Sequence, residues 1–296
     1  MATLREVRNR ISGIKKTQKI TRAMKMVAAA KLRRAQMNVI AARPYAAKMK
    51  ELLVQLAGQA KEQPGSLLVP REEAKRSLLM VVTSDRGFCG AFNSNVVKAA
   101  VEHINSRMAP APGQEPVGLV CVGKKGSDYF TKRQYVIHER RIGVFNQLVF
   151  AEAQGIARSL VAGYQGGEYD RVEIIYNEFK SVAQQRIVVE QFLPVPAEVK
   201  DDKRPHRDTD YIYEPSAPDL LGALVPKYLD FQIWRVLLES YAAEVGARMA
   251  AMENATENAS DLIEALQLQY NKARQAAITK ELLEVVSGAE ALTHAD

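Results

Sequence analysis

The last seventy or so residues of the chain, from about Leu220 to Leu292, restrict its fold more than any other stretch. No proline follows Pro226, and apolar or small residues return at alternating steps of three and four: Ala242, Val245, Met249, Met252, Thr256, Ala259, Ile263, Leu266, Tyr270, Ala273 and Ala277. This spacing predicts one helix with a heptad seam. Such a helix would be roughly 100 Å long, whereas a compact domain of about 300 residues has a radius of gyration of about 19 Å. The helix must therefore project from the domain, and its seam must be covered.

A second long helix is expected at the other end of the chain. Between Thr3 and Gln59 the only proline is Pro44, and apolar residues recur at Leu4, Val7, Ile11, Ile14, Ile20, Met24, Val27, Leu32, Ala35 and Val39. Residues 1–50 carry fourteen Lys and Arg against one acid, while residues 239–296 carry four basic and ten acidic residues. Because the two charges are opposite and both seams need cover, we expect the helices to form an antiparallel pair.

The middle of the chain has short apolar runs that alternate with helical segments, instead of one long heptad pattern. Apolar runs that are typical of buried strands occupy residues 77–84, 117–122, 172–179 and 187–192, and a shorter strand is expected at 135–138. Helical segments are expected between them, at residues 93–108, from residue 127, and at 145–164. Alternating strands and helices predict an α/β domain with a mainly parallel sheet, whose last two strands form an antiparallel hairpin at one edge.

The expected fold is therefore α/β: a long antiparallel coiled coil of the N- and C-terminal helices, plus a central Rossmann-like α/β domain. Its expected parts are an N-terminal coiled-coil helix at 1–60, the α/β domain at 75–195, a linker at 196–218 and a C-terminal coiled-coil helix at 219–292.

Two strand-to-helix loops could in principle hold a phosphate. They are Thr83–Asn93 (TSDRGFCGAFN) and Gly123–Ser127 (GKKGS), and glycine-rich loops at helix N-termini bind anions through free N–H groups. Neither loop fits the P-loop or the dinucleotide-binding pattern. We therefore interpret their glycines as turn and packing residues rather than as a nucleotide site.

No other group of residues forms a convincing active site. The four histidines are scattered without the spacing of metal ligands. Cys89 would need a histidine base to act as a nucleophile, and a packed thiol is the better interpretation. The basic N-terminal helix could bind nucleic acid, but its charges point in most directions and no aromatic residue precedes Tyr45. We expect no catalytic residue, no bound cofactor, no metal and no nucleic acid.

The composition limits where the chain is expected to work. No apolar run approaches the ~20 residues that span a bilayer, and the start MATLREVRNR shows neither a secretory signal nor an evident transit peptide. Only two cysteines occur, Cys89 and Cys121, which fits a reducing compartment.

Three stretches resemble the gamma subunit of F-type ATP synthases. They are Ile20–Arg33 (ITRAMKMVAAAKLR), Thr83–Asn93 and Tyr270–Leu292 (YNKARQAAITKELLEVVSGAEAL). The third contains the family's signature residues: Ile278, Thr279, Glu281, Glu284, Gly288 and Ala289, with Ala291 closing it. The order of helix, α/β domain and helix also matches, so the resemblance covers the whole chain.

The resemblance implies a non-catalytic rotor, the central stalk that couples proton or sodium flow to ATP synthesis or hydrolysis on the beta subunits. Its partners would be the alpha and beta subunits of the catalytic hexamer, the epsilon subunit and the ring of c subunits. ATP or ADP with Mg would then lie on partner subunits. The chain would be peripheral on the cytoplasmic face of a bacterial cell membrane, held there only through the complex.

The resemblance also implies which residues contact partners. Beta-subunit contacts are expected at Met24, Lys25, Arg274, Gln275, Thr279 and Glu281, and an apolar bearing surface at Val285–Leu292. Two other functions stay open: a free-standing α/β nucleotide-binding protein with dimerising helices, and a basic nucleic-acid binder. Well-behaved isolated protein with tight nucleotide affinity would favour the first, and salt-sensitive DNA or RNA binding by residues 1–50 would favour the second.

Overall fold

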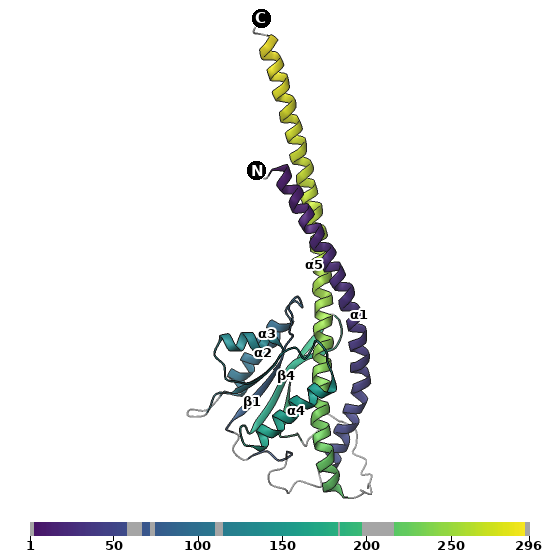
Figure 1. The fold of residues 1–296 in the computed structure, drawn as a ribbon, viewed down its shortest axis with the longest axis vertical. Coiled ribbons are helices and arrows are strands. Elements are labelled where there is room, and N and C mark those ends of the chain that lie inside the picture. Colours follow the sequence, from purple (N-terminus) through teal and green to yellow (C-terminus); the bar gives the residue numbers. More distant parts are fainter. Residues whose placement is uncertain are drawn as a thin grey trace. The chain divides into compact units, whose positions relative to one another are not determined.

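The computed structural model describes residues 3–57, 67–71, 75–109, 115–182, 184–196 and 216–293 (Figure 1). The elements in chain order are α1 (Leu4–Ala57), β1 (Ser77–Val82), α2 (Phe92–Arg107), β2 (Gly118–Val122), α3 (Lys124–Lys132), β3 (Ile137–Arg141), α4 (Phe150–Gln165), β4 (Arg171–Phe179), β5 (Gln185–Leu193) and α5 (Ala217–Thr293). Two long terminal helices and a mixed α/β centre confirm the predicted fold class.

The chain divides into two compact units, and each long helix runs through both. The first unit comprises Met1–Val27 and Met249–Asp296, and the second comprises Ala28–Arg248. Both helices continue through a proline, Pro44 in α1 and Pro226 in α5, although each proline removes one backbone hydrogen bond from its helix. None of the described helices is both long and apolar enough to cross a membrane.

The second unit is built on a five-stranded sheet with the order β3-β2-β1-β4-β5. β1 pairs in parallel with both β2 and β4, β2 pairs in parallel with β3, and only β5 is antiparallel, beside β4. The predicted hairpin at the edge of the sheet is therefore confirmed. From β1 the chain first adds β2 and β3 on one side of the sheet and then adds β4 and β5 on the other side. The position between β1 and β4 is therefore the topological switch point of the fold.

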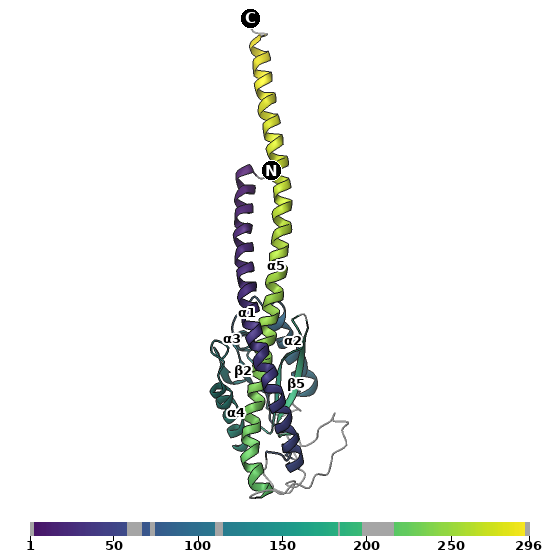
Figure 2. The same ribbon diagram turned by 90° about the vertical axis from the view of Figure 1, so that its right-hand side faces the viewer.

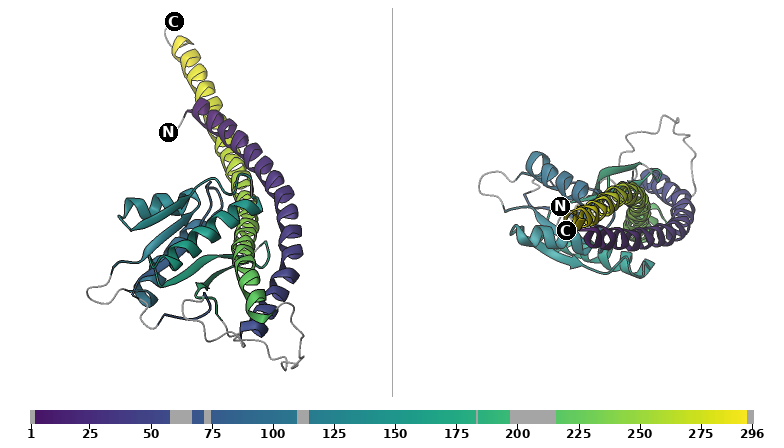
Figure 3. Two further views of the ribbon diagram at one scale, coloured as in Figure 1. Left: turned by 60° about the horizontal axis from the view of Figure 1, so that its bottom comes forward. Right: turned by 90° about the horizontal axis from the view of Figure 1, so that it is seen from above.

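Two apolar cores lie on opposite faces of the sheet, with helices on both sides (Figures 1 and 3). Alternate residues of β1 serve each core: Leu78, Met80 and Val82 pack with α4, α5 and the end of α1, whereas Leu79 and Val81 pack with α2 and the strand neighbours. Burial on both faces explains why β1 reads as a continuous apolar run. The long helices are thus part of the core of this unit.

Several element bounds differ from expectation. α3 begins at Lys124 rather than Ser127, β3 extends over Ile137–Arg141, and α4 begins at Phe150. α3 starts early because Gly123, with φ of +91°, turns the chain directly from β2 into the helix. A turn in which the Asn146 amide donates to the Gly143 carbonyl precedes α4 and occupies residues that we assigned to that helix.

Candidate functional site

The carboxyl edge of the sheet at the switch point is where an open α/β fold usually binds a ligand. In this chain α5 occupies that edge. The Arg248 Nη2 atom donates to the Gly87 carbonyl, 3.3 Å away, in the loop after β1. A Cβ added at Gly246 would lie 3.4 Å from the ring of Phe179, at the end of β4. At this edge α5 therefore contacts both the loop after β1 and the end of β4.

The loop GKKGS has no amides left for a phosphate in its first turn. The Lys124 amide donates to Asp85 Oδ1 (3.0 Å), the Lys125 amide to the Ser84 carbonyl (3.1 Å), and the Gly126 amide to Thr83 Oγ1 (2.8 Å). Since Asp85 is itself an anion at this helix terminus, a phosphate would also be repelled. The occupied amides favour the packing interpretation over nucleotide binding.

The glycines of this loop are required by close packing. A Cβ at Gly123 would lie 2.1 Å from the Thr83 carbonyl oxygen, and one at Gly126 would lie 2.8 Å from Thr83 Oγ1. Real Cβ atoms do not approach other atoms so closely, so only glycine lets α3 start directly beside the end of β1.

Cys89 is a packed thiol. It is buried, and its Sγ accepts a hydrogen bond from Asn93 Nδ2 at 3.2 Å, while Asn93 also binds the Ser84 amide through Oδ1. Burial raises the pKa of the Cys89 thiol, and the hydrogen bond with Ser84 only partly offsets this. With no histidine among these contacts, the thiol has no base, so a nucleophilic role is not supported.

The described histidines do not form a metal centre. His103 pairs with Glu173 at 2.5 Å, and His138 lies beside the ring of Tyr169, whereas His206 and His294 lie outside the described residues. Within the described ranges no three His, Cys, Asp or Glu side chains are grouped to hold a metal ion.

In the first unit α1 and α5 are antiparallel and joined by polar side chains. Gln18 Nε2 donates to Ser260 Oγ at 2.7 Å, the hydroxyls of Thr21 and Thr256 lie 2.8 Å apart, and Lys25 pairs with Glu253. As the residue number rises along α1, the partner's number falls along α5, which defines the antiparallel direction. Figure 2 shows the two helices side by side here.

These polar layers correct the interpretation of the α1 seam. We expected Ile20 and Val27 on its apolar face, but both are exposed, at 59% and 56%. Gln18, Thr21 and Lys25 take the inward positions instead, because each finds a hydrogen-bonding or charged partner on α5. A polar pair within a seam fixes the register of two helices at some cost in stability.

The predicted seam residues of α5 are buried or half-buried. Met252, Ile263 and Leu266 are buried and Met249 and Ala273 are half-buried in the first unit. Val245 is buried within the second unit.

The predicted partner-contact residues fall into two groups that the structure does not bring together. Met24 and Lys25 are half-buried on α1, level with Glu253. Those of α5 lie at least about 30 Å further along the helix, counting from Glu253 at 1.5 Å per residue: Arg274, Gln275, Thr279, Glu281 and Val285, all exposed. Leu292 belongs to the helical backbone, but its side chain lies outside the described residues.

The C-terminal part of α5 carries exposed apolar side chains. Beyond Ala277, every side chain that the structure describes is exposed up to Ala289. The large apolar ones are between 49% and 69% exposed: Ile278, Leu282, Leu283, Val285 and Val286. We call residues 278–289 the tip. A contiguous apolar surface of this kind marks an interaction site.

Sequence reasoning missed the side chains that join α5 to the rest of the second unit. Glu239 is buried and pairs with Arg43 of α1, and Arg235 pairs with Glu190 of β5. A charged residue inside an otherwise apolar helical stretch was the available signal, because a buried charge needs a partner.

The chain is similar to known proteins over its full length. A family described as ATP synthase matches residues 3–292. The ATP synthase gamma chain of Chloroherpeton thalassium is 50% identical over 300 residues, covering 99% of each chain. That of Chlorobaculum tepidum is 50% identical over 292 residues, also covering 99% of each.

Solved structures show the same fold. The central stalk and c-ring structure of the Tetrahymena thermophila mitochondrial ATP synthase contains a chain with 28% identity and a TM-score of 0.59, covering 80% of this chain and 99% of that one. A chain in the Euglena gracilis mitochondrial ATP synthase has a TM-score of 0.67 at 21% identity, covering 98% and 94%.

Proposed function

The chain belongs to the family of ATP synthase gamma subunits, and from this premise we propose how it works as the central stalk. It is a rotating shaft that couples proton or sodium flow through the membrane ring to ATP synthesis or hydrolysis on the beta subunits. The observation that carries this proposal is full-length similarity at 50% identity to chains named as gamma chains. The chain catalyses no bond chemistry, and ATP or ADP with Mg is bound by its partners.

The partners follow from the parts of the chain. The tip turns inside the hexamer of alpha and beta subunits, where a smooth apolar surface avoids directional bonds that would have to break at every step. The α/β domain lies at the foot, against the epsilon subunit and the c-subunit ring. The complex holds the chain at the cytoplasmic face of a bacterial cell membrane.

Two groups of residues contact the beta subunits in this proposal. Met24 and Lys25 act from α1, and Arg274, Gln275, Thr279 and Glu281 from α5. Support for the α5 group comes from the exposure of its four side chains beyond the polar layers. Their separation along the shaft means that a hexamer would meet them at two levels, so that one rotation changes several beta-subunit loops at once.

The proposal is tested by purification and by rotation. A tagged chain purified from its native membrane should bring alpha, beta, epsilon and c subunits with it. With the hexamer fixed by its beta subunits and a bead on the α/β domain, Mg-ATP should drive rotation in one direction, and a hexamer supplied with ADP alone is the matched control. A chain that purifies without these subunits, or stays still while ATP is hydrolysed, would contradict the proposal.

A further inference from the structure

The last residues of β4 lack a strand on one side. β4 pairs with β1 only as far as Ile175, opposite Val81, whereas its pairing with β5 continues to Phe179, opposite Gln185. Backbone N–H and C=O groups that are buried must find partners. The end of β4 therefore needs hydrogen-bonding groups from another element.

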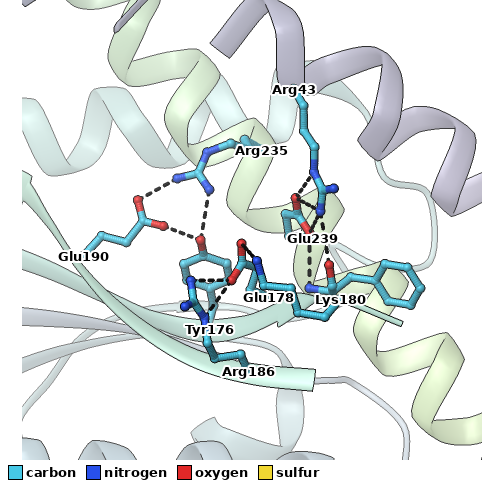
Figure 4. Close-up of polar contacts among 9 residues, drawn as sticks. Arg43, Tyr176, Glu178, Lys180, Arg186, Glu190, Arg235 and Glu239 are labelled. Atoms are coloured by element: carbon cyan, nitrogen blue, oxygen red, sulfur yellow. Dashed lines mark hydrogen bonds and ion pairs between the residues drawn. The ribbon is translucent and has the colours of Figure 1, made fainter. Parts of the chain in front are cut away.

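One ion pair between the long helices supplies those groups (Figure 4). Glu239 of α5 accepts a hydrogen bond from the Phe179 amide at 3.1 Å, and Arg43 of α1 donates to the Phe179 carbonyl at 3.1 Å. Arg43 and Glu239 also bind each other through two bonds, of 3.0 and 3.2 Å. The side chain of Glu239 is only 3% exposed. Helices α1 and α5 and strand β4 thus meet at one carboxylate.

A second ion pair lies one turn earlier on the same face of α5. Arg235 Nη2 donates to Glu190 of β5 at 2.6 Å, and Arg235 Nη1 donates to the hydroxyl of Tyr176 at 2.9 Å. Tyr176 in turn donates to Glu190, which closes the triangle in Figure 4. Burial alone would raise the pKa of Glu190, but Arg235 and the hydrogen bonds outweigh burial and lower it, so the pair stays charged.

Directional bonds resist a motion that apolar packing resists poorly. A helix with its side chains has a radius of about 5–6 Å, so turning it by about 30° about its own axis moves its surface by about 3 Å. That displacement breaks a hydrogen bond, whose strength falls steeply with distance and angle. Leucine and valine side chains on the same face can slide into new contacts instead, because apolar attraction is non-directional.

We propose that these two ion pairs, Arg43–Glu239 and Arg235–Glu190, form a torsional lock between the α/β domain and the two shaft helices. The inference rests on the proposed function, in which the α/β domain receives torque at the foot and α1 and α5 deliver it to the hexamer. The four side chains are positioning residues: they keep the shaft from twisting against the domain that drives it.

The test compares twisting in the assembled complex. Arg43→Leu and Glu239→Leu remove the bonds, Glu239→Gln keeps the shape and one acceptor oxygen, and Glu51→Leu is the matched control, since Glu51 forms an exposed pair with Lys48 on the same helix. With the hexamer fixed, a bead on the α/β domain reports angular fluctuation during each pause. In the membrane-bound complex, the readout is protons pumped for each ATP hydrolysed.

The lock predicts a defined pattern. Arg43→Leu and Glu239→Leu should each raise the angular variance by about twofold, as expected if charge-assisted bonds supply about half of the stiffness. The effect of the double variant should be clearly smaller than the sum of the two single effects, because both substitutions remove the same two Arg43–Glu239 bonds and each removes only one further bond of its own, to the Phe179 backbone. Glu239→Gln should be intermediate, with ATP hydrolysis close to that of the control. The number of protons pumped for each ATP should fall as the angular variance rises, so the variant with the largest variance should pump the fewest.

Other outcomes overturn the inference. If Glu239→Gln and Arg43→Leu match Glu51→Leu in variance and pumping, the Arg43–Glu239 pair does not carry torque and the lock is wrong. If the effects of Arg43→Leu and Glu239→Leu simply add, they act through separate contacts and the lock is wrong. Failure of the unaltered chain to rotate at all would instead contradict the proposed function, so the two failures are distinguishable.

Discussion

Replacing Leu266 with aspartate should open the helix pair of the first unit. Leu266 is 5% exposed on α5, whereas Leu268, two residues later, is 59% exposed. The contacts of Gln18 with Ser260 and of Lys25 with Glu253 set an antiparallel register, and extending it toward the N-terminus places Leu266 level with Ile11. The same substitution at Leu268 therefore gives a control of identical chemistry on the solvent side.

The magnitude follows from burial. Truncating a buried leucine to alanine costs about 2–5 kcal/mol, and leaving a carboxylate unpaired in an apolar seam adds a penalty of several kcal/mol. For Leu266→Asp we expect the free energy of unfolding of the first unit to fall by at least about 4 kcal/mol. At Leu268 the change should stay within about 0.5 kcal/mol, as is usual for exposed positions.

The assay is urea unfolding of the full chain, followed by circular dichroism at a helix-sensitive wavelength. Leu266→Asp should lower the midpoint of the transition that involves the long helices, and Leu268→Asp should leave it unchanged. Equal effects at the two positions, or a larger one at Leu268, would show that the seam faces another way and that the register is wrong.

Three further predictions concern other parts of the chain. Burial alone would raise the pKa of Asp170, but hydrogen bonds from Arg71 and two backbone amides outweigh burial and lower it. Its contribution to stability is therefore complete above about pH 4, the ordinary pKa of an unfolded Asp, and is lost as pH falls from there through the lowered pKa of the folded chain. Urea midpoints should drop in acid, and less so in Asp170→Asn. Thr21→Val alone should cost about 0.5–1.5 kcal/mol because it removes one partner of a part-buried hydrogen bond, whereas adding Thr256→Val should cost little more, and additive losses in urea midpoints would contradict the pairing. Truncation after Gly288 should spare assembly with alpha and beta subunits but lower the protons pumped for each ATP, and complete loss of assembly would show that residues 289–296 are needed to build the complex.

Periodicity and charge could predict the architecture because they are local properties of the sequence. The heptad spacing of α5 needs only its own residues to be recognised, and the burial of β1 on both faces appears as an uninterrupted apolar run from Leu78 to Val82. The opposite charges of residues 1–50 and 239–296 indicated which helices would pair. The strand order of the sheet could be narrowed to few arrangements, since parallel strands must be joined through helices.

The polar contacts could not be predicted in the same way. Ile20 and Val27 are apolar and yet exposed. The polar side chain of Thr21 faces inward instead, because α5 offers it a hydrogen-bonding partner in Thr256. The pairing of Arg43 with Glu239 depends on the backbone groups of Phe179, which need hydrogen-bonding partners at the end of β4. They lack a neighbouring strand there because β1 is shorter than β4. Such contacts are properties of two or three elements together, so no single stretch of sequence contains them.

The helical form of the tip could be predicted from its own sequence, whereas its exposed apolar side chains are explained only by contacts with other subunits. Its residues keep the helical spacing of the rest of α5, yet Ile278, Leu282 and Val285 are exposed in the chain alone. A free helix of this length is marginal in water, and its apolar surface would favour association with other molecules. Both difficulties disappear if other subunits enclose it. The described segment with the most exposed apolar side chains is therefore the one whose sequence is best explained by the assembly in which it turns.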